Sequence, residues 1–401
     1  MNIPEAIDWK FGRLALLSDG EWLSYQDLNI VTDELAAHIL EILGPGPEPV
    51  TVFADFGRWF TITAIAIWKA GKISVQVAKE QSDERIKAQL KRIPTRLVLT
   101  TQSDINALLK HDAPPSSLFN LDRMTGWLFV GGQKRGSWNP EISFFEFTSG
   151  STGMPKVVAH THQTEINLAK TNAGDLQVSQ DSRVAHMRGG ISGYQNMALA
   201  LLSGAALVVR PADVAKYADW INTNKISVLP MLASSYRYLM SSNATFPSVK
   251  VVEVGGEMVD YGDLDLFREA FSDTCLFINR YSTSETRVIA RGTYNRHSPK
   301  MQGRLPVGWP IDGVLVKIVN EKQNEVPWAG MIGEIAVLTP YLHQNASGWY
   351  MTGDLGYIGH DGIIFHCGRK DFQEVRAKFD PPELSDGEKL DRVINTTLGS
   401  L

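Results

Sequence analysis

The sequence predicts an α/β protein with a mostly parallel core and a smaller β-rich part towards the C-terminal end. Near the N-terminus, short apolar runs alternate with helix-like stretches, which is typical of a parallel sheet. After about residue 300, turns containing glycine separate short β-rich runs, which indicates a small antiparallel sheet or barrel. The chain has 401 residues, 43% of them hydrophobic, and is therefore too long for one simple domain.

The N-terminal part of the chain can be assigned element by element. Two apolar runs flank Asp19-Gly20, which predicts a hairpin. A helix is expected from Tyr25 to Leu43, ended by prolines at three of the next six positions. Strands are expected at 50–54, 72–77 and 96–100, and helices at 59–70 and 82–92, with Gly71 where a helix C-cap would lie. The stretch 101–140 carries less pattern and is expected to be a surface excursion.

Composition and charge exclude several classes of protein. The formal net charge is −5 without a basic patch, which disfavours nucleic acid as a partner. Cys275 and Cys367 are the two cysteines, so a disulfide framework is not expected and a reducing compartment fits. No signal peptide is evident, and weakly polar stretches such as 197–210 fall short of the ~20 residues of a membrane span. We therefore expect a soluble cytoplasmic protein without a membrane partner.

One glycine- and hydroxyl-rich loop stands out. An apolar run at 142–147 leads into Thr148-Ser149-Gly150-Ser151-Thr152-Gly153-Met154-Pro155-Lys156. Glycines let successive backbone N–H groups converge on one point, and the lysine supplies a compact positive charge. These features predict a cradle for a polyphosphate, although a Walker A pattern is absent. The competing interpretation is a Ser/Gly-rich linker, but linkers rarely follow an apolar strand and end in Pro-Lys-Val-Val.

This loop resembles the phosphate-binding motif of the adenylate-forming superfamily, which includes acyl- and aryl-CoA ligases, luciferases and the adenylation domains of nonribosomal peptide synthetases. Its members activate a carboxylic acid with ATP, giving an acyl-adenylate and pyrophosphate. The resemblance implies two mostly parallel sheets with helices and a small distorted β-barrel subdomain, which would divide this chain into 1–300, 301–371 and a hinge and tail at 372–401. It also implies a catalytic charge on Lys156 and phosphate contacts from Thr148, Ser149, Gly150, Ser151, Thr152 and Gly153.

Two further motifs resemble the nucleotide site of the same family. The run from Val251 ends in Gly255-Gly256-Glu257, where the family places adenine, although a plain strand-to-turn transition would look the same. Asn279-Arg280-Tyr281-Ser282-Thr283-Ser284-Glu285 is similar to the family's Asn-x-Tyr-Gly-x-Thr-Glu. The resemblance implies that Tyr281 packs on adenine, Ser284 contacts phosphate and Glu285 holds Mg²⁺, a cation that prefers carboxylates and phosphate oxygens. Ser282 replaces the family's glycine and adds a side chain near the nucleotide.

The last motifs lie between positions 349 and 371. Thr352-Gly353-Asp354-Leu355 matches a family motif in which the aspartate accepts hydrogen bonds from both ribose hydroxyls, which implies that role for Asp354. Gly368-Arg369-Lys370-Asp371 matches the next motif, which implies that Arg369 reaches the ribose or phosphate and that Asp371 lies at the hinge. A single Asp in a Gly-Asp turn is usually a turn residue. Several motifs in the expected order, from position 10 to position 373, favour the family interpretation.

His160 and His162 are close in sequence and follow the phosphate loop. A metal pair would need further Cys, His or carboxylate partners, and none is obvious. We expect instead that one of them starts a helix at 163–172, and assign neither a catalytic role. The family's reaction needs no side-chain nucleophile, because the substrate carboxylate attacks the α-phosphate in line while Lys156, Mg²⁺ and backbone donors stabilise the charge.

The nature of the acid can be addressed by aligning residues 201–205 with the family's Leu-Leu-Ser/Thr-Gly-Ala. Ile191 then stands where amino-acid-activating domains carry the Asp that pairs with the substrate ammonium. Ile191 cannot pair with an ammonium, which would be costly to leave unpaired, so an aryl, fatty, hydroxy or keto acid is expected. Arg280 is expected to face either a polar group of the substrate or the surface. The same alignment predicts a mostly apolar pocket wall that also includes Ser192, Gln195, Val228, Val252, Val254, Val288 and Ile289.

The resemblance therefore implies ATP- and Mg²⁺-dependent activation of a carboxylic acid without an α-amino group, for transfer to coenzyme A or a phosphopantetheinyl carrier protein. Full-length members continue into a small C-terminal domain with a second lysine, whereas this chain ends at Leu401, a short tail after Asp371. Either the gene lacks that domain or the chain is an N-terminal piece, and we expect slow adenylation and poor thiol transfer by this chain alone. The alternative is a non-catalytic nucleotide- or acyl-binding remnant with a docking or regulatory role. An unrelated α/β NTPase is disfavoured by the absent Walker A loop.

Overall fold

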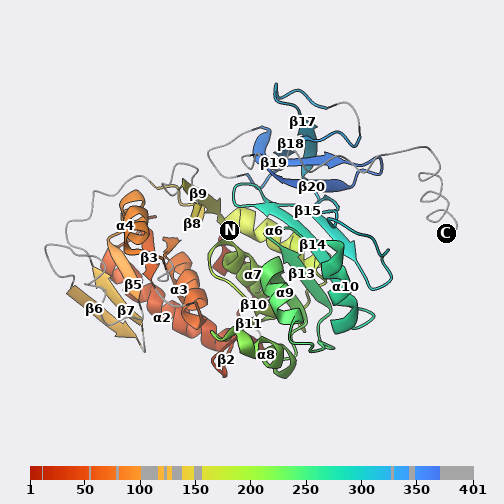
Figure 1. The fold of residues 1–401 in the computed structure, drawn as a ribbon. Coiled ribbons are helices and arrows are strands. Elements are labelled where there is room, and N and C mark those ends of the chain that lie inside the picture. Colours follow the sequence, from red (N-terminus) through yellow and green to blue (C-terminus); the bar gives the residue numbers. More distant parts are fainter. Residues whose placement is uncertain are drawn as a thin grey trace, which may run out of the picture.

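The structure is a computed structural model of the 401-residue chain. It describes residues 1–10, 12–53, 56–77, 81–100, 116–121, 124–128, 138–148, 156–326, 329–342 and 348–370. These residues form three β-sheets. Figure 1 shows the two large sheets side by side and the small sheet above the one that contains β13 (Val251–Gly255), β14 (Leu276–Thr283) and β15 (Arg287–Tyr294). The alternation of strands and helices predicted for a mixed α/β fold is confirmed.

The larger central sheet contains nine strands in the described residues and is parallel in its middle. From one edge to the other these are β16 (Trp309–Pro310), β15 (Arg287–Tyr294), β14 (Leu276–Thr283), β13 (Val251–Gly255), β12 (Val228–Leu232), β10 (Arg183–His186), β11 (Ala206–Val209), β1 (Leu14–Ser18) and β2 (Glu21–Ser24). The β1–β2 hairpin turns at Asp19-Gly20 as predicted. Both residues have positive φ (53° and 81°), the conformation that Asp and Gly tolerate in tight hairpins.

The second sheet contains seven strands in the described residues. Their order is β6 (Ser116–Leu121), β7 (Met124–Leu128), β5 (Leu97–Thr100), β3 (Pro49–Phe53), β4 (Ile73–Gln76), β8 (Ile142–Thr148) and β9 (Lys156–Thr161). Strands β3, β4, β5 and β8 are parallel, as expected for βαβ units, whereas β6, β7 and β9 are antiparallel additions. Strands β6 and β7 lie within 101–140, the stretch that was expected to be a surface excursion and in which no strand was assigned.

Helices cover the two large sheets and fill the space between them (Figure 1). The helical elements are α1 (Ile3–Ala6), α2 (Tyr25–Leu43), α3 (Arg58–Lys69), α4 (Asp83–Arg92), α6 (His162–Asp175), α7 (Gly190–Leu202), η1 (Val214–Lys216), α8 (Tyr217–Thr223), α9 (Ala233–Met240) and α10 (Tyr261–Ala270). Helix α2 matches its predicted bounds because Ser24 caps it in a capping box and Gly44 follows it. Gly71, at φ 65°, follows α3 as predicted.

One apolar core joins the two large sheets. It contains buried residues from both, such as Leu16 of β1 and Phe144 of β8, together with residues of α2, α3, α6 and α7. Trp68 of α3 is almost fully buried there and donates its indole N–H to the carbonyl of Ser143 (2.7 Å). The N-terminal elements are thus held against the strand that leads into the phosphate loop, which gives that strand a fixed position.

The third sheet is the β-rich part expected after residue 300. In the described residues it has four antiparallel strands, β17 (Leu315–Val319), β18 (Gly333–Leu338), β19 (Tyr350–Ile358) and β20 (Ile364–Arg369). The first and last of these strands do not pair with each other, so the described part is an open sheet where the family resemblance implied a distorted barrel. An isolated bridge between Gly308 and Ile364 ties it to the central sheet. In the described residues, no helix combines the length and apolarity that crossing a membrane requires.

Candidate functional site

A cavity of about 1050 Å³ lies where the strands of the central sheet end and the four-stranded sheet begins. Its walls come from the ends of β13 and β14, from the turn after β14, from β19 and from β20. Strand ends in open α/β sheets are common places for ligands, because loops there can present polar groups without interrupting the sheet. The predicted residues that line this first cavity are Lys156, Gly256, Glu257, Arg280, Tyr281, Ser284, Glu285, Asp354 and Arg369.

Asp354 on β19 is the centre of a hydrogen-bonded group in this cavity. The Tyr281 hydroxyl donates to Asp354 Oδ2 (2.7 Å), and Arg369 Nη1 donates to Asp354 Oδ1 (3.3 Å). The His366 Nε2 atom lies 3.5 Å from Asp354 Oδ1. Thr352 fixes the turn, since its hydroxyl donates to the Ile335 carbonyl (2.8 Å) and accepts from the Asp354 N–H (3.1 Å). Motifs that are far apart in the sequence are thereby brought together.

The electrostatics of this group keep Asp354 ionised. Burial alone would raise the pKa of Asp354, but His366, Tyr281 and Arg369 together hold this pKa below its ordinary value. Burial, with the nearby carboxylate of Asp354, raises the pKa of Tyr281 well above its ordinary value, so its hydroxyl remains a donor. An ionised carboxylate has about four acceptor positions. Asp354 can therefore accept further hydrogen bonds from hydroxyl groups in the cavity.

The phosphate loop is described only at its two ends. Thr148, the last residue of β8, pairs with Lys156, the first residue of β9, so the loop between them leaves and re-enters the sheet at adjacent positions. Lys156 is exposed and lines the first cavity. The predicted phosphate contacts of Ser149, Gly150, Ser151, Thr152 and Gly153 lie outside the described residues, as does the hinge position Asp371, and for Thr148 only the backbone is described.

The two glycines after β13 are explained by crowding and by backbone conformation. A Cβ on Gly255 would lie 2.6 Å from the Arg280 carbonyl oxygen, because β13 and β14 pair at this point. Gly256 has φ +76°, and a Cβ there would approach Leu232 to 2.7 Å. Gly256 and Glu257 line the cavity, whereas Gly255 only lets the strands approach each other. Glu257 accepts hydrogen bonds from the N–H and hydroxyl of Ser234 (2.6 and 3.0 Å).

The turn after β14 presents Ser284 and Glu285 to the same cavity. Thr283 Oγ1 accepts from the Thr286 N–H (3.1 Å) and closes the turn. Ser282, which replaces the family's glycine, does not have a positive φ. The added side chain therefore carries no backbone strain at this position. Instead, Arg287 is the residue in the left-handed region here, at φ 66°.

A second cavity of about 380 Å³ continues from the first. The two share Gly256, Glu257, Arg280 and residues 282–284. Four of the predicted acid-pocket residues line it: Ile191, Ser192, Gln195 and Arg280. Arg280 has 12% of its side chain exposed and forms an ion pair with Glu253 (Nη1 to Oε2, 3.2 Å), so it faces the cavities and not the outer surface.

The other five predicted pocket residues lie in packed cores and line none of the three described cavities. Each is at most 2% exposed: Val228, Val252, Val254, Val288 and Ile289. Side chains alternate across a strand, so a shift of one residue in an alignment exchanges a cavity position for a core position. The prediction of a mostly apolar wall does not describe the second cavity, which is lined by three arginines and two glutamates besides its serines and threonine.

Several residues that line the second cavity were not predicted. They are Glu146, Arg188, Leu232, Thr283 and Arg287. Glu146 was the one charged residue within the apolar run of β8, and Leu232 stands at the carboxyl end of β12 directly before α9. Both positions carry a signal in the sequence. No local pattern marks Arg287, which reaches the cavity from the first position of β15.

Buried ion pairs surround this cavity. Arg287 is fully buried and donates to Glu165 of α6, and Glu253 bridges Arg280 and Arg291. Burial raises the pKa of Glu146 to about 7, and Arg287 opposes that rise. His160 Nε2 lies 3.6 Å from Glu146 Oε2. His162 begins α6, with Thr161 as its N-cap, so the predicted role of a histidine at the helix start is confirmed.

A third cavity, of about 460 Å³, lies on the far side of the α7 N-terminus. It shares Glu146, Arg188 and Ile191 with the second cavity, and Phe56, Phe60 and Phe147 form part of its wall. Neighbouring cavities in this series thus share wall residues, from β19 and β20 at the first cavity to β3 and β4 at the third. Such a series can hold an elongated ligand with a polar group near Asp354 and another near Arg188.

A sequence model described as "AMP-binding enzyme" matches residues 6–350. The chain belongs to the AMP-binding enzyme family. Among its relatives, N-benzoylphenylalaninol synthetase apmA of Penicillium brevicompactum is 25% identical over 95% of this chain and 17% of its own length. The L-proline--[L-prolyl-carrier protein] ligase of Streptomyces coelicolor is 26% identical over 87% of this chain and 74% of its own length. The chain spans 5–17% of the length of the large synthetases among these relatives.

Solved structures share the fold. The N-terminal subdomain of Klebsiella oxytoca NpsA, in complex with 3-hydroxybenzoyl-AMSN, has a TM-score of 0.74 and 19% identity, covering 92% of this chain and 98% of that one. CmiS6 has a TM-score of 0.79 and 19% identity, covering 92% of this chain and 97% of that one. The three-sheet architecture of this AMP-binding family member is thus also that of adenylation N-terminal subdomains.

Proposed function

We propose that this chain binds ATP in the first cavity and activates a carboxylic acid without an α-amino group, giving an acyl-adenylate and pyrophosphate. The observation that supports this most is the group around Asp354. An ionised, buried carboxylate is held by a tyrosine and an arginine in a cavity that also contains Lys156 and Glu285. A ribose diol needs an acceptor of this kind, and a triphosphate needs the cation and the metal-binding carboxylate.

Each residue has a proposed role in that reaction. Asp354 accepts hydrogen bonds from the ribose hydroxyls, Tyr281 packs on the adenine, and Arg369 orients Asp354 and reaches the ribose or phosphate. Lys156 stabilises the negative charge that develops on the α-phosphate when the substrate carboxylate attacks it in line. The Ser/Thr/Gly loop at 148–153 and Ser284 supply further donors to the phosphates. The chemistry needs no nucleophilic side chain, because the acid itself is the nucleophile.

The described residues fit a magnesium ion that is held mainly by ATP. Glu285 is half-buried, lines the cavity and forms no ion pair in the described part of the chain. No group of three or more His, Cys, Asp or Glu in the described residues could hold a metal ion by itself. Mg²⁺ usually keeps several waters and takes one or two carboxylates with phosphate oxygens. Bound in this way, it would neutralise part of the phosphate charge during the transfer.

The proposal extends to the acceptor and to the organisation of the chain. We propose coenzyme A or a carrier-protein phosphopantetheine as the thiol acceptor, since the relatives include a ligase named for a prolyl-carrier protein. Residues 1–300 would form the α/β core and 301–371 the β-rich part that completes the nucleotide site. A cytoplasmic location would suit this use of ATP. Ile191 in the second cavity supports an acid without an α-ammonium.

The alternative is a nucleotide- or acyl-binding module without catalysis. The dense packing of ion pairs around the second cavity would serve such a module as well as an enzyme. ATP–pyrophosphate exchange with a panel of aryl, fatty, 2-hydroxy, keto and amino acids separates the two. Exchange stimulated by acids without an α-ammonium supports the proposed activity. ATP binding by calorimetry without exchange for any acid would favour the non-catalytic module, and a clear preference for one ordinary amino acid would overturn the proposed acid class.

A further inference from the structure

The second cavity offers more hydrogen-bond donors than its own acceptors satisfy. Arg287 is fully buried and donates to Glu165, yet in the described part of the chain its Nε and Nη1 have no partner. Arg280 donates to Glu253 through Nη1 (3.2 Å), and its buried Nε has no partner among the described residues. Both side chains line the cavity. Buried donors without acceptors are costly, so these N–H groups favour a ligand that brings oxygen acceptors.

The N-terminus of α7 points to a ligand of the same kind. This 13-residue helix starts at Gly190, and its N-cap residue, Gly189, has no side chain with which to cap it. The Ile191 N–H donates to Glu146 Oε1 at 3.4 Å, a long hydrogen bond. Ile191 and Ser192, both in the first turn, line the second cavity. Free N–H groups and the helix dipole together favour negative charge at such a position.

Arg188 adds a formal charge beside this helix end. Arg188 is an exposed residue that lines both the second and the third cavity and, in the described part of the chain, forms no hydrogen bond or ion pair. The other charges around the second cavity are largely balanced, since Arg287 pairs with Glu165, and Glu253 lies between Arg280 and Arg291. Glu257 accepts hydrogen bonds from Ser234. A guanidinium without a partner facing a cavity is suited to a carboxylate, which it can bind in bidentate geometry.

Glu146 already contacts this helix end through Ile191, and its charge acts on Arg188. Its Oε2 atom is buried and has no hydrogen-bond partner. Burial raises its pKa to about 7, so this carboxyl group takes up a proton more readily than an exposed glutamate does. A negatively charged ligand nearby would raise this pKa further and make Glu146 a donor. The cavity therefore offers both positive charge and hydrogen-bond donors to an anionic group of the ligand.

We propose that the acid activated by this chain is a short dicarboxylic acid, one carboxylate of which reacts with ATP while the other binds Arg188 at the N-terminus of α7. This inference rests on the proposed adenylation and adds the substrate class. The second cavity is lined by residues 282–284, which it shares with the first cavity, and by Arg188, which it shares with the third. Ile191 fits this assignment, because an acidic side chain there would repel the second carboxylate.

The test compares diacids with their monoamides, which keep the shape and lose one charge. ATP–pyrophosphate exchange is measured with butanedioic, pentanedioic and hexanedioic acids and with the monoamide of each. At least one diacid should have a KM about 10- to 100-fold below that of its monoamide, the usual effect of a charge-assisted pair. Arg188→Gln should remove this difference by raising KM for the diacid, with kcat little changed.

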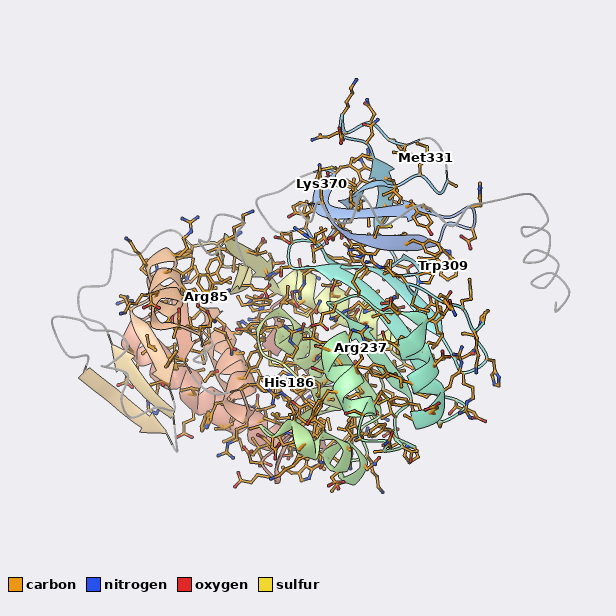
Figure 2. All side chains as sticks on the ribbon, viewed as in Figure 1. Arg85, His186, Arg237, Trp309, Met331 and Lys370 are labelled. Carbon is orange, nitrogen blue, oxygen red and sulfur yellow. The ribbon has the colours of Figure 1, made fainter. Side chains whose placement is uncertain are left out.

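Arg85→Gln is the matched control. It removes the same charge from another exposed arginine, on α4 (Figure 2), which lines none of the described cavities, and should keep the preference for the diacid. Exchange in which monoamides or other monocarboxylic acids equal the diacids would overturn the inference and leave the proposed adenylation standing. If no acid supports exchange, the proposed adenylation fails. Calorimetry with the diacids then tests the anion site independently of the reaction. Binding that Arg188→Gln abolishes would support the site, and absence of binding would overturn it.

Discussion

The first and second cavities differ in how they are built. In the first, the polar residues come from short contiguous motifs at the ends of β13, β14, β19 and β20, and hydrogen bonds such as that between Tyr281 and Asp354 fix them to each other. In the second, single residues from β8, α7, β12, β14 and β15 meet around buried ion pairs. When a site is built from motifs, the residues that carry its chemistry can be recognised from the local sequence. A site made of single side chains depends on the register of every contributing strand.

This contrast leads to predictions of different kinds for the two cavities. Substitutions of the ion pairs around the second cavity should change the stability of the protein. Substitutions at the first should change the binding or chemistry of ATP with little effect on folding.

The largest effect is expected from Arg287→Met. Removing one partner of a buried ion pair leaves the other charge uncompensated, so this change should lower the free energy of unfolding by about 3–5 kcal/mol. Urea unfolding measures the effect. The double variant Glu165→Gln/Arg287→Met should lose less than the sum of the two single variants, because it leaves neither charge unpaired. An Arg287→Met protein as stable as the wild type would show that the pair is not part of the framework.

Lys156→Met should slow acyl-adenylate formation by about 10²- to 10³-fold, because it removes a fixed positive charge from the reacting phosphate. Single-turnover formation of the adenylate measures the rate. Thermal unfolding should be little changed, since Lys156 is exposed. Lys300→Met, another exposed lysine that lines none of the described cavities, is the control. A variant at Lys156 with the wild-type rate would remove this residue from the mechanism.

Asp354→Asn should weaken ATP binding by about 1–3 kcal/mol, because the ribose hydroxyls lose an ionised acceptor. Asparagine keeps the size of the side chain and can still accept from Tyr281, so the fold should be preserved. Calorimetry with ATP and, in parallel, with inorganic tripolyphosphate separates the ribose from the phosphates. The loss should appear for ATP alone. Equal losses for both ligands would mean that Asp354 acts through the phosphate region.

The smallest effect concerns His186 at the end of β10. It is fully buried and packs against Phe56 and Phe60, and both ring nitrogens lack hydrogen-bond partners in the residues that the structure describes. Burial together with Arg210 lowers its pKa to about 3. Between that value and its ordinary pKa of 6.5, the unfolded chain binds a proton that the folded chain does not. Stability due to this neutral histidine is therefore lost as the pH falls below about 6.5.

His186→Phe should reduce this acid sensitivity by about 1 kcal/mol per pH unit between pH 6 and 5. Urea unfolding at both pH values gives the slope, and His360→Gln, at an exposed histidine, is the control. His186 lies within the body of the central sheet in Figure 2. An unchanged slope in the phenylalanine variant would mean that the acid sensitivity arises from other groups.

The fold could be predicted from the sequence wherever local signals were strong. The hairpin at Asp19-Gly20 and helix α2 with its Ser24 cap were found because turn and capping residues act over a few positions. Strands β6 and β7 were missed, since they are antiparallel additions to a sheet whose parallel strands carried the pattern. The expectation of a β-rich part after residue 300 followed from the change in turn residues there.

The residues of the site could likewise be predicted only where local sequence signals were strong. The motifs around Asp354 and Tyr281 placed their residues in one cavity, because each motif lies where a strand ends. The lining of the second cavity was predicted only in part. Ile191 and Ser192 were found on the first turn of α7, but Val252 and Val254 point into the core of the opposite face of β13. Arg188 and Arg287 could not be found, since only the folded chain shows that they face the same space.

The most direct test of the two-cavity account is a crystal structure of this chain with a non-hydrolysable analogue of the acyl-adenylate of its best acid. The account predicts both ribose hydroxyls within hydrogen-bonding distance of Asp354, the adenine against Tyr281, and the acyl chain in the second cavity beside Ile191 and Arg280. A nucleotide bound away from Asp354, or an acyl chain that avoids the second cavity, would contradict it.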